Sequence, residues 1–160
     1  MRGVPHRADV PLGIMIETPA AVITADTLAK EVSFFSIGTN DLVQYTLAVD
    51  RGNARLATRF TPLHPAVLRL IRRTFEVGQA HGLNVSVCGE MASEPLMAFA
   101  LIGIGLRTLS VAPRSVGRMK QIVRGIHASV AADAAKAALD AGTAFAAEWI
   151  LRERLSAELG

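Results

Sequence analysis

The amino-acid sequence predicts an α/β fold in which helices cover a parallel β-sheet. Short, fully apolar runs alternate four times with longer segments whose apolar residues recur at helical spacing. Runs that are apolar on both faces are typical of strands buried on both sides, as in parallel sheets. Aromatic residues make up only 5% of the 160 residues, and frequent alanine with few aromatics favours helices packed on a sheet over a β-sandwich.

The predicted elements follow a βα order. The predicted strands are residues 12–16, 34–37, 85–87 and 108–112. The predicted helices are residues 19–30, 65–81, 94–102, 115–124 and 129–159, the last of them broken or weakened near Gly142. Pro19 and Pro65 suit a first helical turn, and Ser93 is a candidate N-cap for the helix that follows it. Thr39 or Asn40 is the candidate N-cap of a further helix after the second strand.

Two architectures fit this order, because both have parallel strands joined by right-handed helical crossovers. A closed eight-stranded (β/α) barrel needs about 250 residues, whereas an open doubly wound sheet is complete in about 150. Chain length alone therefore favours the open sheet. The sequence has no Gly-x-Gly-x-x-Gly after a strand and no Walker loop.

Composition excludes several classes of protein. The net charge is +3 and the arginines are scattered, without a basic stripe interleaved with aromatics, so nucleic-acid binding is not expected. The longest apolar run, residues 96–106, is too short to span a membrane and contains two glycines. The first residues have no apolar segment typical of a signal peptide, so we expect a cytoplasmic protein. A single cysteine excludes an internal disulfide framework.

Polar residues follow the predicted strands, at the edge of a parallel α/β sheet where ligands bind. Glu17 follows the first strand, Asn40 and Asp41 follow the second, and Cys88 follows the third. Two carboxylates are hard ligands that leave most of the octahedral Mg²⁺ shell open for water and substrate oxygens. The amide of Asn40 and the guanidinium of Arg51 are anion donors, and the thiol of Cys88 is a candidate proton donor or nucleophile.

Each of these residues also has a structural interpretation. An acidic residue or asparagine after a strand is often a helix cap, and Arg51 fits a solvated loop. A lone cysteine in a cytosolic chain is usually a small buried apolar residue. The four histidines have no partners that the sequence can place, and His64 and His81 look like helix-boundary residues. The functional interpretation therefore rests on the shared position of the candidate residues at strand ends.

Four motifs carry a specific resemblance. They are Gly13-Ile-Met-Ile-Glu-Thr-Pro-Ala-Ala, Phe34-Phe-Ser-Ile-Gly-Thr-Asn-Asp-Leu, Gln44-Tyr-Thr-Leu-Ala-Val-Asp-Arg-Gly-Asn and Val87-Cys-Gly-Glu-Met-Ala. In this order they resemble the phosphoenolpyruvate–protein phosphotransferases, the first enzymes of the bacterial sugar phosphotransferase system. The resemblance extends over about residues 13–125. Pyruvate phosphate dikinase and phosphoenolpyruvate synthase share the Thr-Asn-Asp-Leu region, but the first and third motifs are more similar to the phosphotransferase.

The resemblance implies a different architecture from the one that length favours. It implies the later four βα units of a (β/α)₈ barrel, forming one partial domain over residues 1–160 with a helical extension at about 129–159. It also implies a set of roles: Glu17 and Asp41 would hold Mg²⁺, and Asn40 and Arg51 would bind phosphoenolpyruvate (PEP). Cys88 would protonate the enolate carbon.

The resemblance further implies a reaction and its partners. The phosphoryl group of PEP would pass to a protein histidine with release of pyruvate, and then to a phosphocarrier protein, in a homodimer. The family's acceptor histidine lies in a Thr-Ser-His-Ala-Ala-like motif, which is absent from this sequence. We therefore expect a part of such an enzyme that is incomplete alone. The alternatives are a non-catalytic half-barrel used for assembly, and a fragment of a dikinase or synthase.

Overall fold

The computed structural model describes residues 7, 9–50 and 52–160 and confirms the predicted α/β fold. Its four strands are β1 (Gly13–Ile16), β2 (Phe34–Gly38), β3 (Asn84–Cys88) and β4 (Thr108–Leu109). All neighbouring pairs are parallel, and the spatial order is β1-β2-β3-β4. A doubly wound sheet reverses its strand order at a switch point, whereas a barrel keeps the order of the chain. The sheet therefore has the topology of half a (β/α)₈ barrel, as the resemblance implied.

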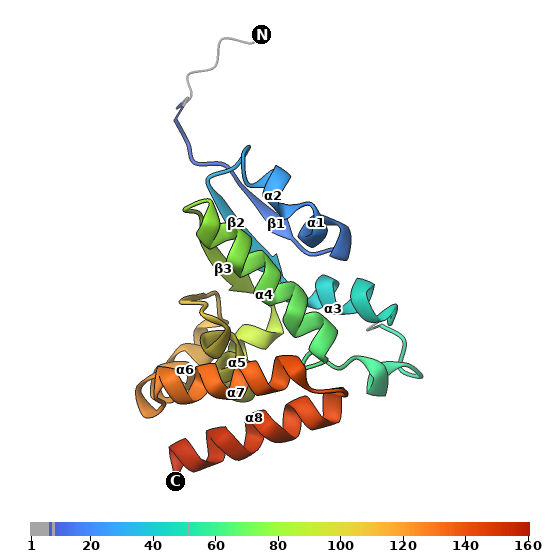
Figure 1. Ribbon diagram of the computed structural model, residues 1–160, viewed down its shortest axis with the longest axis vertical. Coiled ribbons are helices and arrows are strands. Elements are labelled where there is room, and N and C mark those ends of the chain that lie inside the picture. Colours follow the sequence, from blue (N-terminus) through green and yellow to red (C-terminus); the bar gives the residue numbers. More distant parts are fainter. Residues whose placement is uncertain (1–6, 8, 51) are drawn as a thin grey trace.

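Helices connect and extend these strands (Figure 1). They are α1 (Pro19–Ile23), α2 (Ala25–Leu28), α3 (Thr39–Leu47), α4 (Pro65–Ala80), α5 (Pro95–Ile104), α6 (Val116–Gly125), α7 (Ala128–Asp140) and α8 (Ala144–Leu159). Three short 3₁₀ turns are η1 (Ala57–Arg59), η2 (Glu90–Ser93) and η3 (Pro113–Ser115). The extra helix expected at the carboxyl end is a pair, α7 and α8, and Gly142 lies in the turn between them.

The predicted helix over residues 19–30 is divided into α1 and α2 at Thr24. The Thr24 hydroxyl donates to the carbonyl of Ala20 at 3.0 Å, and the residue leaves helical geometry at ψ 14°. A threonine that bonds to nearby backbone competes with the helix, which accounts for the break. Helix α4 begins as predicted: His64 is its N-cap, and the Nδ1 atom accepts from the Ala66 amide at 3.1 Å.

Two predicted caps are wrong. Ser93 is not the N-cap of α5, because Pro95 restricts the preceding Glu94 to extended backbone, and Glu94 becomes the cap. The Ser93 hydroxyl instead accepts from the Ala112 amide at 3.3 Å. Helix α3 begins directly at Thr39, with Gly38 as its N-cap, so Asn40 lies inside the first turn.

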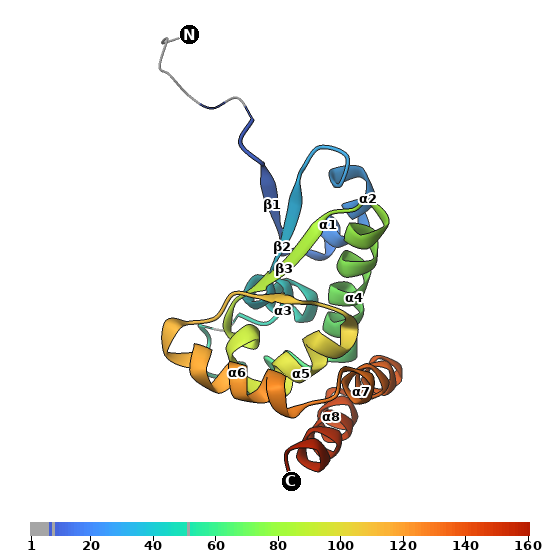
Figure 2. The ribbon, with the colours of Figure 1, turned by 90° about the vertical axis from the view of Figure 1, so that its left-hand side faces the viewer.

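The two faces of the sheet are covered differently. Figure 2 shows α1, α2 and α4 together on one side of strands β1–β3, and the other side has no covering helix among the described residues. The covered face buries five strand residues: Ile16, Phe35, Ile37, Val85 and Val87. Helix α4 approaches β3 closely because Gly78 has no side chain, and a Cβ there would lie 2.2 Å from Val85.

Helices α5, α7 and α8 form a second packed region. Gly103 of α5 lets α7 approach, since a Cβ at that position would lie 2.1 Å from the Ala131 carbonyl oxygen. At the far end of α8, the His127 amide and imidazole both bond to the Glu158 carboxylate. The pKa of Glu158 is lowered, chiefly by the bond from the His127 backbone amide.

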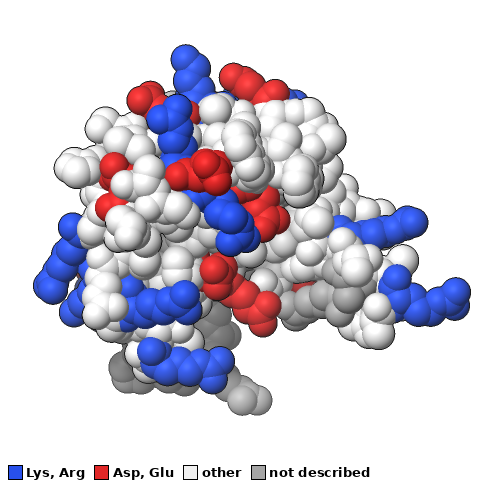
Figure 3. All heavy atoms as spheres, turned by 90° about the horizontal axis from the view of Figure 1, so that it is seen from below, with Lys and Arg blue, Asp and Glu red and all other residues white. Residues whose placement is uncertain are grey.

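Charged side chains do not gather by sign on the side formed by the carboxyl-terminal helices. Figure 3 shows lysine and arginine interspersed with aspartate and glutamate on this side. Helix α8 contributes one such mixed pair, in which Arg152 donates to Glu148 at 2.6 Å. Within the part of the chain that the structure describes, no helix is long and apolar enough to cross a membrane.

Candidate active site at the carboxyl ends of the strands

Three neighbouring strands align Glu17, Gly38 and Cys88 in one row. Ile16 pairs with Ile37, and Gly38 pairs with Cys88, so Glu17 leaves β1 beside Gly38. The Glu17 carboxylate lies across Gly38, where an added Cβ would be 2.8 Å from Oε2. Gly38 is therefore the residue that lets the Glu17 side chain cross the end of β2. The sheet register thus brings together residues that are 71 positions apart in the sequence, at 17 and 88.

Asn40 and Asp41 lie in the first turn of α3, directly after β2. The Asn40 side-chain oxygen faces the η2 turn and accepts a hydrogen bond from the Glu90 amide at 3.4 Å. Because the oxygen is used in this way, the amino group of Asn40 is left as the donor to a ligand. Both side chains are partly exposed, as a substrate-binding amide and a metal-binding carboxylate would need to be.

Cys88 is held by β2 at the end of β3. Its thiol donates to the carbonyl oxygen of Ile37 at 3.4 Å, and the Ser36 hydroxyl donates to the sulfur at 3.5 Å. The side chain is partly buried and forms no disulfide. These two contacts hold the Cys88 side chain against β2.

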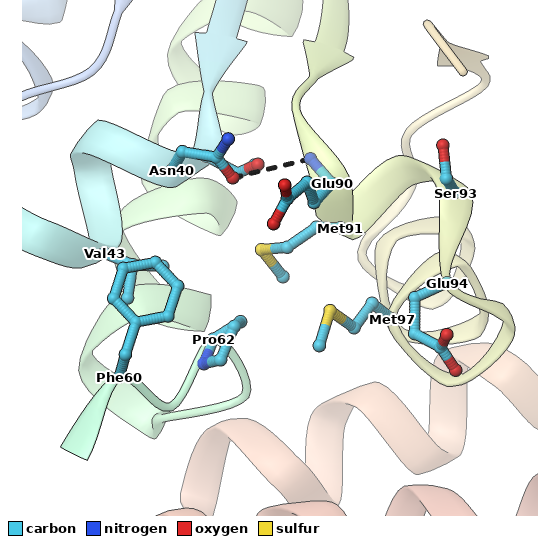
Figure 4. A pocket seen from close by; sticks show the side chains of 10 residues that line it. Asn40, Val43, Phe60, Pro62, Glu90, Met91, Ser93, Glu94 and Met97 are labelled. Carbon is cyan, nitrogen blue, oxygen red and sulfur yellow. Dashed lines mark hydrogen bonds between the residues drawn. The ribbon is translucent and has the colours of Figure 1, made fainter. Parts of the chain in front are cut away.

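A cavity of about 370 Å³ lies between α3, η2 and α5, and it is lined by Thr39 and Asn40 but by none of Glu17, Gly38 and Cys88. Figure 4 shows Asn40 and Glu90 joined at its upper side, with Phe60 and Pro62 opposite Met91 and Met97. A second hollow of about 380 Å³ continues past Asn40 and Glu90 toward the end of β4, where Arg114 lines it. Asn40 is thus at the junction of an apolar cavity and a more polar one.

Arg51 lies outside the described residues, so its predicted role stays a prediction. The loop on either side is held locally: the Gly52 amide donates to Asp50 at 2.8 Å, and the Arg55 amide donates to Asn53 at 3.0 Å.

The donor set fits Mg²⁺. Glu17 and Asp41 form no ion pair with any described residue, so their oxygens are not used by a neighbouring cation. The described residues contain no cluster of three or more metal-ligating side chains. The carboxylates of Glu17 and Asp41 are the type of ligand that Mg²⁺ takes, since this ion is usually held by one or two carboxylates together with water and substrate oxygens.

Sequence reasoning missed four residues of this site. Gly38, Ser36 and Gly89 were not singled out, and Thr39 was considered only as a helix cap. A signal was available for the first two, because Ser36 and Gly38 alternate with buried Phe35 and Ile37 and must face the other side of β2. For Thr39 and Gly89 the signal is a contact across strands, described below, which a single sequence does not contain.

Comparison with known proteins identifies the family. The sequence matches the family described as PEP-utilising enzyme, PEP-binding domain, over residues 1–128. The chain belongs to this family. It is 42% identical over 147 residues to the phosphoenolpyruvate-protein phosphotransferase of Haemophilus influenzae, covering 92% of this chain and 26% of that protein.

Other relatives have related names. The chain is 44% identical over 135 residues to the phosphoenolpyruvate-protein phosphotransferase of Buchnera aphidicola, covering 84% of the chain and 24% of that protein. It is 47% identical over 136 residues to the multiphosphoryl transfer protein of Xanthomonas campestris, covering 85% and 16%. The family resemblance seen in the motifs is therefore confirmed, and the chain spans about a quarter or less of the length of these relatives.

Proposed function

We propose that this chain forms the later half of the PEP-binding barrel of a PEP-dependent protein phosphotransferase, the part that produces pyruvate. The observation that carries the proposal is the row of Glu17, Gly38 and Cys88 at the ends of three strands, with Asn40 beside it. In the reaction, the bond between the phosphorus and the enol oxygen of PEP breaks, and a phosphorus–nitrogen bond forms on a protein histidine. The phosphoryl group then passes to a phosphocarrier protein.

Cys88 completes the reaction by protonating carbon 3 of the enolate, which converts it to pyruvate. The contact from its thiol to the Ile37 carbonyl supports this role, because it fixes the position of the sulfur at the end of β3. The Ser36 hydroxyl, which donates to the sulfur, stabilises the thiolate that is left. The thiolate is then reprotonated from solvent.

Glu17 and Asp41 would hold Mg²⁺, which neutralises charge on the phosphoryl and carboxylate oxygens of PEP when it is bound. The amino group of Asn40 and the guanidinium of Arg51 would bind the anionic substrate in fixed orientation. A cytoplasmic location and a role in sugar uptake are also part of this proposal, whereas the names of the relatives support only the phosphotransferase activity.

The test is calorimetric titration of the folded chain with PEP, with and without Mg²⁺. Binding should require Mg²⁺ and should weaken more than about tenfold in a Glu17→Ala, Asp41→Ala variant, because each carboxylate removed leaves charged groups without a partner. A Glu31→Ala, Asp133→Ala variant is the matched control, since both acids are exposed and form no ion pair with a described residue.

The outcomes separate the two main possibilities. Mg²⁺-dependent binding that the control retains and the site variant loses would show a usable half-site. If the folded chain does not bind PEP, an autonomous half-site is excluded. If a separately made upstream half also fails to restore Mg²⁺-dependent pyruvate formation in a folded complex, the proposed activity is wrong.

A second candidate function is assembly through the uncovered side of the sheet. Strand β1 is an edge strand, and Met15 is 50% exposed on it, while Leu12 just before it is 68% exposed. Exposed apolar edges favour pairing with another chain. For the chain alone we propose a homodimer of half-barrels, which concentration-dependent sedimentation would reveal.

A further inference from the structure

The strongest unexplained contact of the site belongs to Thr39. Its side chain is fully buried, and its hydroxyl donates to the backbone carbonyl of Cys88 at 3.0 Å. The two residues are 49 positions apart. This single bond ties the first residue of α3 to the last residue of β3, and therefore ties the chain that carries Asn40 to the chain that carries the thiol.

A second bond runs in the same direction. Asn40, the next residue of α3, accepts from the Glu90 amide at 3.4 Å, as the dashed line in Figure 4 shows. The two bonds therefore connect consecutive residues of α3 to both sides of Gly89. Each is made between a side chain of one strand end and the backbone of the next.

Gly89 makes this close contact possible. Its φ is 105°, and an added Cβ would lie 2.4 Å from the Thr39 hydroxyl oxygen and 3.3 Å from the Asn40 side-chain oxygen. No L-residue fits there without displacing Thr39. The two strand ends are thus in direct van der Waals contact as well as hydrogen-bonded.

Thr74 is a natural comparison because it is the other fully buried polar residue among those that the structure describes. Its hydroxyl donates to the Leu70 carbonyl one turn earlier in its own helix, at 3.0 Å. That bond is local and affects only α4. The hydroxyl of Thr39, in contrast, donates to the carbonyl of Cys88 in strand β3, outside its own helix.

We propose that Thr39 is a positioning residue that fixes the spacing between the Asn40 amide and the Cys88 thiol. The inference rests on the proposed function for the roles of these two groups. Thr39 itself is fully buried at the edge of the cavity, and its hydroxyl is directed to the Cys88 carbonyl. It acts by holding the PEP-binding amide and the proton donor in one rigid unit, so that the thiol meets carbon 3 of a bound substrate.

The test uses the single cysteine of the chain, which makes total thiol alkylation a measure of Cys88 alone. Thr39→Val removes the hydroxyl and keeps the shape, Thr39→Ser keeps the hydroxyl, and Thr74→Val is the matched control. Alkylation by iodoacetamide at fixed pH should be about fivefold faster in Thr39→Val, the factor equivalent to one lost hydrogen bond. Thr39→Ser and Thr74→Val should both react as the unsubstituted chain does.

Equal alkylation rates in Thr39→Val and Thr74→Val would overturn the inference, as would a Thr39→Ser variant that reacts as fast as Thr39→Val. If Thr39→Val does not fold, Thr39→Ala is a second hydroxyl-free variant.

Titration with PEP separates this inference from the proposed function. If PEP binds, Thr39→Val should slow pyruvate methyl-proton exchange in the assembled enzyme more than it weakens PEP binding, because spacing affects proton transfer most. If neither the chain nor its complex with the upstream half binds PEP, the proposed function fails, while the alkylation rates still decide whether Thr39 positions Cys88.

Discussion

The two faces of the sheet differ in what they contribute to the molecule. On the covered face, Phe35 and Ile37 are fully buried beneath the helices. On the open face of the same strand, Phe34 is 36% exposed and Ser36 bonds to the cysteine of the next strand. Because strand side chains alternate between faces, one short strand serves both purposes. Stability is concentrated on one side of β2 and the chemistry of the site on the other.

The difference between the two faces predicts which substitutions alter stability and which alter the site or its assembly. The covered face resembles the interior of a complete domain, where side chains interdigitate without space to spare. The open face combines the small side chains of Ser36 and Cys88 with the exposed Met15 and Phe34, and in a closed barrel these would meet the strands of the other half. Changes on the first face should therefore alter unfolding, and changes on the second should alter the site or its assembly.

Substitution of the adjacent residues Phe34 and Phe35 should give the largest change in unfolding free energy and the clearest difference between the two faces. Phe35→Ala should lower the free energy of unfolding by about 3–5 kcal/mol, because it removes a fully buried ring. Phe34→Ala should lower it by only about 1–2 kcal/mol, since the ring is partly exposed and lies over Gly13. Urea unfolding of both variants measures the difference, and equal losses would show that the two faces are equally packed.

The sequence predicted the strands but not the difference between their faces, because apolar runs indicated strands buried on both sides whereas helices cover only one face among the described residues. The strands, their parallel order and the strand-end positions of Glu17 and Cys88 follow from local apolar patterns. Length favoured an open sheet, and only the motifs indicated a barrel. The break at Thr24 was missed because the competing bond from its hydroxyl depends on side-chain geometry.

Alanine substitutions at two glycines, one in the site and one in an exposed helix, should change the free energy of unfolding by intermediate amounts. Gly89→Ala should lower the free energy of unfolding by about 1–3 kcal/mol, because its φ of 105° is strained for alanine and the new methyl would meet Thr39. Gly117→Ala, in α6 with nothing within 4 Å, should instead stabilise by about 0.5–1 kcal/mol. Thermal unfolding distinguishes the opposite signs.

The contact between Gly89 and Thr39 could not be predicted from the sequence. Thr39 and Gly89 are 50 positions apart, and their proximity depends on the register that pairs Gly38 with Cys88. A strand end can be predicted from the apolar pattern of one segment, but register depends on two segments and on the helices that fix them. A neutral Gly89→Ala variant would mean that the close approach of the two strand ends is not needed.

The smallest effect on stability should come from the open edge, where the effect on association should be clear. A Leu12→Lys, Met15→Lys variant places two charges on exposed positions at β1, so its unfolding free energy should change by less than about 0.5 kcal/mol. Charged edge residues oppose strand pairing between chains. If half-barrels dimerise through this edge, sedimentation should show the variant as a monomer at concentrations where the unsubstituted chain associates.

The control variant places two lysines at exposed apolar positions elsewhere on the surface. Ile23 is 67% exposed on α1 and Val123 is 51% exposed on α6, so Ile23→Lys, Val123→Lys adds the same charge at similar exposure. That variant should associate as the unsubstituted chain does, because neither residue lies at a strand edge. An unsubstituted chain that stays monomeric at every concentration would rule out the dimer. Equal association of both variants would show that the open face of the sheet is not the surface through which chains meet.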